Sequence, residues 1–306
     1  MTEQTLLPTF APSEQDMVDM ALAQPLERKI ERAIMLLKHW EPAALKLDPR
    51  GYWVADSFGK DSDCIVELAK MAGVAHHCEH NLTTLDPPEL IHYGKRVRPE
   101  THINKPSEPL LHRMLSKTCG PPTRKIRWCC EEYKERGGGG GVAKIIGIRI
   151  EESGARAKMW SEFVHHTQNN ARNNGFVLCP IAYWTTKDVW EFHGVRKLPH
   201  CCLYDEGFTR LGCVGCPKAS AKNQAMEFSR WPKIETAWRR AFDKFWEAMG
   251  DRKRRDGTDY DWRRYGNANG HYQWWRSGVG QGDGPACQGA ELFATHELGE
   301  ENANDE

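Results

Sequence analysis

The chain has 306 residues with 42 basic and 42 acidic side chains, so its overall charge gives no argument for a nucleic-acid partner. It contains no run of the roughly 20 apolar residues that a membrane-spanning helix needs, and no membrane partner is expected. Its first residues lack the basic and then apolar pattern of a secretory signal, so we expect a cytoplasmic protein. In that reducing compartment the cysteines, 11 in all, are expected to bind metal or act in catalysis rather than form disulfides.

Residues 1–45 are expected to form an N-terminal helical segment. Apolar side chains recur at helical spacing, and Pro25 should kink or divide a helix over residues 14–40. The apolar run 52–55 then predicts a strand, and the polar turn 56–62 separates it from a helix-forming sequence. A strand, a glycine-containing turn and a helix in this order begin a parallel α/β sheet.

Strand and helix patterns continue to alternate over residues 46–220. Further strands are predicted at residues 74–78, 143–148 and 176–178, and helices at 88–97, 110–115, 127–134 and 187–192. The glycine run 137–141 is typical of a flexible surface loop. We therefore predict an α/β domain with a doubly wound, mostly parallel sheet and helices on both faces.

The C-terminal part is predicted to be a helical, basic and aromatic region over residues 221–280, followed by a disordered acidic tail, 281–306. Residues 227–249 have the apolar spacing of one long amphipathic helix. The stretch 252–276 combines basic and aromatic residues, which can grip a nucleic-acid backbone and stack on bases. Alternatively, the aromatic side chains pack on the core and the charges are solvated.

The turn after the first strand carries groups that bind anions. It consists of Ser57, Phe58, Gly59, Lys60, Asp61 and Ser62. The backbone N–H groups of such a turn and the N-terminus of the following helix point toward a docked phosphate. Gly59 permits a close approach, Lys60 adds positive charge, and the two serine hydroxyls can donate hydrogen bonds. The alternative is a capped helix after a polar turn.

This turn resembles the S-G-G-K-D-S loop of the PP-loop nucleotide enzymes, with Phe58 in place of the first glycine. A bulky side chain there must point away from the phosphate or reshape the loop. Segments that resemble the phosphoadenylyl-sulfate (PAPS) reductase family, especially its bacterial and phage branch, follow in fixed order at residues 83–90, 121–135, 147–156 and 198–217. The resemblance implies the adenine nucleotide alpha-hydrolase-like fold with a PP-loop nucleotide-binding domain at 46–220 and a helical C-terminal extension.

The resemblance also implies an adenine nucleotide, either ATP or a sulfonucleotide (PAPS or APS), with Mg²⁺ as a candidate companion. Beyond the turn, it places the following residues at the nucleotide: Thr84, Asp86, Glu89, Arg149, Glu152, Ser153 and Arg156. Lys60, Arg149 and Arg156 are the candidate catalytic residues. Both arginines follow a predicted central strand, at the end where open α/β sheets bind ligands, and could grip a phosphate or sulfate. The alternative is a surface salt bridge with Glu151 or Glu152.

The cysteines supply a candidate metal site. Cys213 and Cys216 have a C-x-x-C spacing, which suits either a metal or a redox pair. The resemblance implies that they act with Cys129 and Cys130, as in the iron–sulfur sulfonucleotide reductases. Related DNA-sulfur-modification proteins suggest instead Cys129 with Cys201 or Cys202. Four of Cys129, Cys130, Cys201, Cys213 and Cys216 are expected to hold a 4Fe–4S cluster, with zinc as the alternative.

Three functions are open at this point. The first is an iron–sulfur enzyme of sulfonucleotide reduction or sulfur transfer, which would need a thiol reductant such as thioredoxin. The family's C-terminal Glu-Cys-Gly-x-His motif is absent, and the only late cysteine, Cys287, is the candidate nucleophile. The second is an ATP pyrophosphatase that adenylates an acceptor, such as a nucleic acid, with a structural cluster. The third is a nucleic-acid-binding accessory protein. A homodimer is a further expectation.

Overall fold

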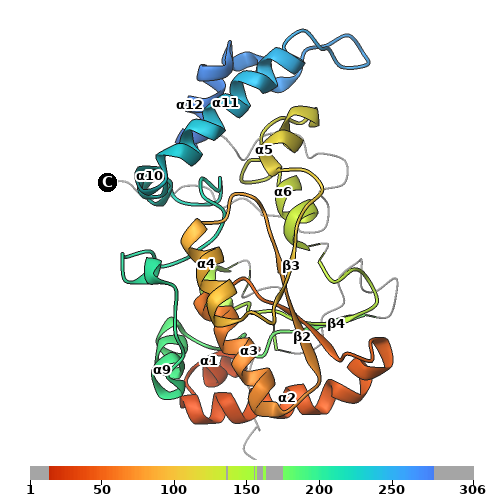
Figure 1. Ribbon diagram of the computed structural model, residues 1–306, viewed down its shortest axis with the longest axis vertical. Coiled ribbons are helices and arrows are strands. Elements are labelled where there is room, and N and C mark those ends of the chain that lie inside the picture. Colours follow the sequence, from red (N-terminus) through yellow and green to blue (C-terminus); the bar gives the residue numbers. More distant parts are fainter. Residues whose placement is uncertain (1–13, 136, 155, 157–160, 163–174, 279–306) are drawn as a thin grey trace, which may run out of the picture.

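The computed structural model describes residues 14–135, 137–154, 156, 161–162 and 175–278 (Figure 1). Its sheet has the strand order β3-β2-β1-β4-β5, and every pairing is parallel. The strands are β1 (Tyr52–Ala55), β2 (His76–Asn81), β3 (His102–Asn104), β4 (Ala143–Ile145) and β5 (Phe176–Leu178). The sheet grows outward from β1 in two directions, so the switch between β1 and β4 creates the crevice where doubly wound folds bind ligands. The predicted fold class is confirmed.

Helices and short turns connect these strands. The first half of the chain contains α1 (Glu14–Leu22), α2 (Leu26–Leu47), α3 (Lys60–Ala72), α4 (Pro88–Val97), α5 (Leu110–Arg113), η1 (Met114–Ser116), α6 (Trp128–Cys130) and η2 (Glu131–Glu135). The second half contains η3 (Ile150–Glu152), α9 (Thr186–Arg196), η4 (Cys202–Tyr204), α10 (Ala221–Arg230), α11 (Pro232–Met249), η5 (Asp261–Tyr265) and α12 (Ala268–Ser277). None of these helices is long and apolar enough to cross a membrane.

Helices α2, α3 and α9 form the layer on one face of the sheet. The neighbouring strand residues Val54, Ile145 and Leu178 are fully buried there, together with Ile65 of α3 and Phe192 of α9. Complete burial of such a side chain contributes about 1.5–3 kcal/mol. This layer therefore fixes β1 and α3, and with them the turn that joins the two.

Several elements match the prediction from sequence, and others differ for local reasons. Strands β1 and β5 and helix α4 have the predicted bounds, and Pro25 separates α1 from α2. The predicted strand 143–148 ends at Ile145, and β3 was not predicted because it is short and polar. The single helix predicted over residues 227–249 is wrong. Pro232 lacks a backbone donor and forces Trp231 out of helical conformation (φ −124°, ψ 67°), so α10 ends before it and α11 begins after it.

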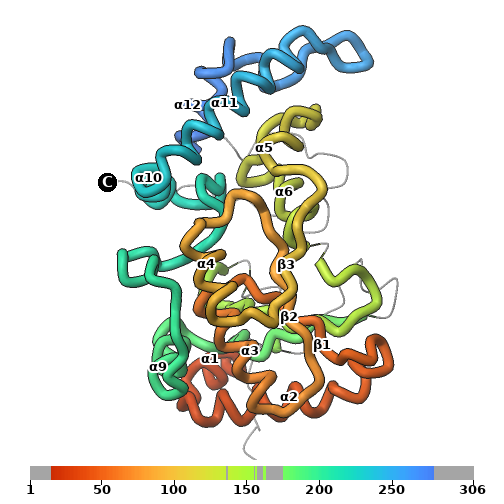
Figure 2. Tube along the Cα trace, viewed as in Figure 1, coloured from red at the N-terminus to blue at the C-terminus, as the bar shows by residue number. Residues whose placement is uncertain are grey.

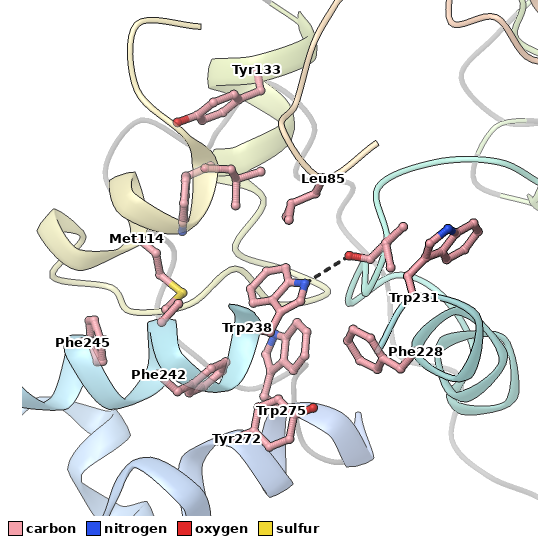
Figure 3. Packing of buried hydrophobic residues seen from close by; sticks show 14 of the residues in the cluster. Leu85, Met114, Tyr133, Phe228, Trp231, Trp238, Phe242, Phe245, Tyr272 and Trp275 are labelled. Atoms are coloured by element: carbon pink, nitrogen blue, oxygen red, sulfur yellow. Dashed lines mark hydrogen bonds between the residues drawn. The ribbon is translucent and has the colours of Figure 1, made fainter. Parts of the chain in front are cut away.

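The C-terminal helices lie at the end of the molecule opposite α2 (Figure 1), and Figure 2 shows the chain running from α9 back to them. They share one hydrophobic core with α4, α5, α6 and the segment that carries Cys213 and Cys216. Trp238, Tyr272 and Trp275 fill its centre and are at most 2% exposed (Figure 3). The aromatic residues of this region thus pack on the core, as the second of the two alternatives predicted.

One buried histidine in this region should make stability depend on pH. The Nδ1 atom of His271 accepts a hydrogen bond from the Trp246 indole (3.2 Å), and burial lowers the pKa of His271 from 6.5 to about 3. Because the pKa of His271 is lower in the folded chain than in the unfolded chain, protons bind the unfolded chain more readily. The resulting contribution to stability is complete above the unfolded pKa and is lost as the pH falls toward the folded pKa. We expect stability to decrease between pH 6.5 and about 3, by roughly 1 kcal/mol per pH unit.

Urea unfolding at several pH values between 7 and 4 would measure this effect. The variant His271→Gln keeps an acceptor but does not titrate, so its stability should depend less steeply on pH. Equal slopes for the variant and the natural chain would contradict the assignment.

Candidate active site

The predicted phosphate loop joins β1 to α3 at the switch point of the sheet. The Ser62 hydroxyl donates to the Gly59 carbonyl (2.8 Å) and lies 3.3 Å from the Ser57 hydroxyl. Lys60 is buried, and its ammonium pairs with the Asp61 carboxylate (2.6 Å). The loop thus brings two hydroxyls, one cation and a helix N-terminus together, which is a set of groups that binds anions.

Phe58 points away from the loop into the core. Its φ of 59° is a left-handed conformation that favours glycine, so the backbone keeps the form that a glycine there would adopt. The ring is fully buried and stacks on His80 with 4.4 Å between centroids. The guanidinium of Arg98 lies 5.5 Å from its centroid. The exchange of glycine for phenylalanine therefore leaves the anion-facing side of the loop open.

Gly94 makes room for this ring. A Cβ atom at position 94 would lie 2.3 Å from Cδ2 of Phe58, so Gly94→Ala should overpack the site and lower the free energy of unfolding by about 1–3 kcal/mol. Denaturant unfolding would measure the loss. In a chain that already carries Phe58→Gly, whose glycine tolerates the positive φ, Gly94→Ala should leave the free energy of unfolding almost unchanged. Additive losses in the double variant would contradict a direct contact.

A buried ion network lies beneath the loop. The Asp56 carboxylate accepts hydrogen bonds from the Phe58 backbone N–H (3.0 Å), the Arg98 guanidinium (2.8 Å) and the Thr101 hydroxyl (2.9 Å). Arg98 also pairs with Asp63, in the first turn of α3. Arg98 thus holds both ends of the loop. Without it, either buried carboxylate would be left unpaired, at a cost of several kcal/mol.

Arg149 is engaged within the protein. Its guanidinium is 3% exposed and donates to Asp61 (2.7 Å), Glu151 (2.6 Å) and the Thr186 hydroxyl (3.2 Å). The salt bridge weighed as an alternative is present, with its arginine buried and its Glu151 side chain 42% exposed. Arg149 therefore fixes Asp61 beside Lys60.

Arg156 lies near several other positively charged side chains. It pairs with Glu152, and its backbone N–H donates to the Ser153 hydroxyl (3.2 Å). Burial, together with the charges of Arg210, Arg127 and Arg149, lowers the pKa of Arg156 to about 10. Mutual repulsion of this kind is relieved when an anion binds.

Arg127 and Lys218 extend this cationic group toward the cysteines. Burial and the charges of Arg127 and Arg210 lower the pKa of Lys218, while the thiols of Cys130 and Cys216 act in the opposite direction. The Nε atom of Arg127 is buried and has no hydrogen-bond partner in the described part of the chain. An unused, buried donor among repelling cations suits an anionic oxygen.

Thr84 and Asp86 shape the turn after β2. Thr84 has a φ of 67°, and its hydroxyl accepts from the Leu110 backbone N–H (3.0 Å). The Asp86 carboxylate accepts from the Thr83 backbone N–H (2.7 Å), and its charge helps to raise the pKa of Lys134. Both residues hold the turn at the carboxyl edge of the sheet.

Glu89 is bonded to the C-terminal helices. Its carboxylate accepts from the Trp231 indole (3.0 Å) and pairs with Arg230 (2.8 Å). In the described structure it therefore links α4 to the junction of α10 and α11. Cys287, the candidate nucleophile, lies outside the described residues.

Four thiols from two distant segments form one electrostatic group around Lys134. Cys129 and Cys130 lie in α6, and Cys213 and Cys216 frame a turn beyond η4. A hydrogen bond between the first two raises the pKa of Cys129 and lowers that of Cys130 to about 5, and the charges of Cys213 and Cys216 act on Cys129 as well. Charge on Cys213, with smaller contributions from Cys130 and Cys216, raises the pKa of Lys134. The side chain of Cys130 is thus strongly biased toward the thiolate form.

The C-terminal helices hold the C-x-x-C turn in place. The Val214 backbone N–H donates to the Leu85 carbonyl (2.8 Å), and the Trp238 indole donates to the Val214 carbonyl (3.1 Å; Figure 3). The Gly215 backbone N–H donates to Glu227 (2.7 Å). Gly215 has a φ of 77°, and a Cβ there would lie 2.7 Å from the Trp238 indole nitrogen. The turn therefore fits only a glycine at this position.

The pair Cys201 and Cys202 is not part of this thiol group. Cys201 is fully buried in the hydrophobic core, and burial raises its pKa to about 11, with Cys202 and Glu89 as its charged neighbours. The thiol of Cys202 is exposed. The arrangement of thiols therefore favours the set with both Cys129 and Cys130.

Four cysteine thiols can hold either a zinc ion or an iron–sulfur cluster. Among the described residues, no three histidine, cysteine or carboxylate side chains are arranged to hold one metal ion. A zinc ion would need four ligands converging at about 2.3 Å. In a 4Fe–4S cluster each thiolate binds a different iron, so the four sulfur atoms stand farther apart around a larger centre.

Two basic residues of this site were not singled out from the sequence. Lys134 follows Cys130 by four residues and Arg127 precedes it by three, which are spacings that place side chains on one face of a helix. That periodicity could have identified both once residues 127–134 were predicted to be helical. Nothing comparable points to Arg210, which approaches from a separate segment.

A polar pocket of about 450 Å³ lies on the face of the sheet opposite α3. Its lining includes Arg50, Trp53, His77, Glu79, Asn81 and Asn104. The Trp53 indole nitrogen and both ring nitrogens of His77 are buried without a well-formed hydrogen bond among the described residues. The glycine run closes one side, since a Cβ at Gly138 would lie 2.8 Å from the Trp53 ring. The predicted loop is present, and it packs against the sheet.

Comparisons with known proteins match part of this chain to one family. Residues 51–219 match the model of the phosphoadenosine phosphosulfate reductase domain. An adenosine 5'-phosphosulfate reductase from Oceanobacillus iheyensis is 29% identical over 134 residues, which cover 42% of this chain and 54% of that protein. An uncharacterized protein from Methanocaldococcus jannaschii is 31% identical over 144 residues, covering 43% of this chain and 26% of that protein.

A solved structure of the PAPS reductase from Candida auris, in a phosphate complex, is 15% identical, with a TM-score of 0.43. The match covers 67% of this chain and 97% of that one. The match to the Oceanobacillus protein spans about half of its length, and the match to the Methanocaldococcus protein about a quarter.

Proposed function

Because the chain belongs to the phosphoadenosine phosphosulfate reductase domain family, we propose that it binds a sulfonucleotide, APS or PAPS, and reduces its sulfonate group with the help of an iron–sulfur cluster. The adenylyl phosphate would lie at the loop of Ser57 to Ser62. The sulfonate would lie among the arginines between that loop and the thiols.

One observation carries this proposal, namely the continuous group of charges between the phosphate loop and the cysteines. Arg149 binds Asp61 of the loop, and Arg156 interacts with Asp61 as well as with Arg127. Arg127 in turn interacts with Cys130. Arg149 is already paired with carboxylates, so a nucleotide that carries anionic groups in succession would bind Arg156 and Arg127.

The polar pocket beside β2 is the space that we assign to the nucleoside end. Its volume of about 450 Å³ lies within the range of small-ligand sites. Asn81 ends β2 and lines the pocket, and the Trp53 and His77 nitrogens, which lie near the Glu79 carboxylate, can form hydrogen bonds with a base or a ribose. No residue of the phosphate loop lines it, so the phosphate and nucleoside ends would be recognised by separate groups.

Cys129, Cys130, Cys213 and Cys216 would hold the cluster. When bound, it would supply a redox-capable metal centre beside the sulfonate. Lys134 balances the negative charge of the thiolates, and the C-terminal helices fix the turn between Cys213 and Cys216.

The reaction needs a thiolate outside this set, and we assign that role to Cys287. The thiolate attacks the sulfonate sulfur, the bond from that sulfur to the phosphate oxygen breaks, and AMP or adenosine bisphosphate leaves with the electron pair. A dithiol reductant of the thioredoxin class then releases sulfite and becomes a disulfide. The arginines stabilise the charge that develops on the departing phosphate.

Nucleotide product analysis tests this function. Anaerobically purified protein would be offered APS, PAPS and ATP in parallel with a reduced dithiol. Sulfite together with AMP or adenosine bisphosphate is the expected result, and Cys287→Ser should abolish it, whereas the exposed Cys202→Ser should not. Formation of AMP and pyrophosphate from ATP, without sulfite from either sulfonucleotide, would instead identify an adenylating enzyme.

A further inference from the structure

The hydroxyl of Tyr204 lies directly on the phosphate loop. It accepts a hydrogen bond from the Lys60 backbone N–H (3.0 Å), which is the first residue of α3. A Cβ atom at Gly59 would lie 3.3 Å from the same hydroxyl. Tyr204 therefore covers the N-terminus of the helix at the point where an anion would dock.

We propose that Tyr204 is an anion-binding residue of this site, which donates its hydroxyl hydrogen bond to a phosphate oxygen held at the loop. This inference rests on the proposed function in one respect only, because it requires that the loop binds a phosphate. Tyr204 comes from the segment that leads to Cys213, more than 140 positions after the loop.

The position of the hydroxyl is fixed by its surroundings. Cys201, directly before the turn η4, and Leu203, within that turn, are fully buried in the core. The Tyr204 ring packs edge-on against Trp190 of α9, with 5.2 Å between centroids. Helix α9 is itself bonded to the loop, since the His193 Nε2 atom lies 2.9 Å from the Lys60 carbonyl. A donor held so firmly loses little entropy when it binds a ligand.

The donor capacity of this hydroxyl is unused. Burial raises the pKa of Tyr204 well above its usual range, so the group keeps its proton. No hydrogen bond from it to another described residue is present. The nearby carboxylates bind other groups instead, since Asp61 binds Lys60 and Arg149 while Asp63 binds Arg98. A phosphate oxygen would complete a chain from the helix N–H through the hydroxyl to the anion, in which each bond strengthens the next.

Isothermal titration of Tyr204→Phe tests the inference. The probes are inorganic pyrophosphate, ATP, APS, PAPS and, as a ligand without phosphate, adenosine. Loss of a hydrogen bond to a charged group should weaken binding of the four anionic probes about tenfold or more. Adenosine binding should stay unchanged. Tyr272→Phe is the matched control, because its hydroxyl binds Glu235 in the C-terminal region.

The possible outcomes separate this inference from the proposed function. Equal affinities in Tyr204→Phe and the natural chain, or an equal loss for adenosine, would overturn the role of Tyr204. Tyr204-dependent binding of pyrophosphate without binding of APS or PAPS would support it and refute the proposed function. If the natural chain binds none of the anionic probes, both fall. Should the variant fold poorly, NMR of ¹³Cζ-labelled tyrosine in the natural chain must show one resonance shifting on addition of pyrophosphate.

Discussion

Replacing Cys213 with serine should abolish binding of iron and sulfide by the anaerobically reconstituted protein. Cys213 belongs to the thiol group around Lys134, and a cluster that loses one of four thiolate ligands is open to solvent and breaks down. Iron and acid-labile sulfide analysis, together with visible absorbance, measures this without any assay of turnover. The same loss is expected for Cys216→Ser, Cys129→Ser and Cys130→Ser.

Cys201→Ala is the matched control for this experiment. Cys201 lies only 12 positions before Cys213 and is also shielded from water, but it packs in the hydrophobic core. We expect this variant to keep its full iron content and to lose only some stability through the small cavity. Loss of iron from Cys201→Ala, with retention in Cys130→Ser, would show that the cluster uses the other ligand set.

Arg149→Met should unfold at a markedly lower denaturant concentration than the natural chain. The substitution leaves Asp61 and Glu151 without their partner beside a guanidinium site that is 3% exposed. Asp61 and Glu151 are 20% and 42% exposed, so water replaces part of the lost interaction, and we expect a loss of about 1–3 kcal/mol. Urea unfolding followed by tryptophan fluorescence would measure the loss.

Arg156→Met provides the contrast at the same site. Its side chain is 29% exposed and lies among like charges, so its removal relieves repulsion and should change stability little. It should instead weaken binding of anionic ligands about tenfold, as expected for loss of a charged contact. If Arg156→Met destabilised the fold as much as Arg149→Met, the division between a supporting and a ligand-binding arginine would be wrong.

The phosphate loop and the central strands could be predicted because local sequence determines them. An apolar run, a polar turn and a helical pattern specify β1, the loop and α3 without reference to the rest of the chain. The same holds for α4, which begins at a proline. Such elements can be read from a single sequence.

Other features depend on distant contacts that no local pattern contains. Phe58 is accommodated by Gly94, 36 positions later in α4, and Arg149 is bound by Asp61, 88 positions earlier. The choice between Cys130 and Cys201 as ligands depends on which thiol lies near Lys134 together with Cys213 and which one packs in the core. Three-dimensional packing decides these points, and spacing alone leaves them open.

The contacts of the C-x-x-C turn extend beyond the end of the family match. The family match stops at residue 219, whereas Trp238 and Glu227 beyond it supply hydrogen bonds that hold Val214 and Gly215. A fragment cut at the end of the match would expose the cavity that the tryptophan fills. The matched range is therefore shorter than the set of residues that holds this turn, and any transplantation of this site into another scaffold would have to carry helices α10 and α11 with it.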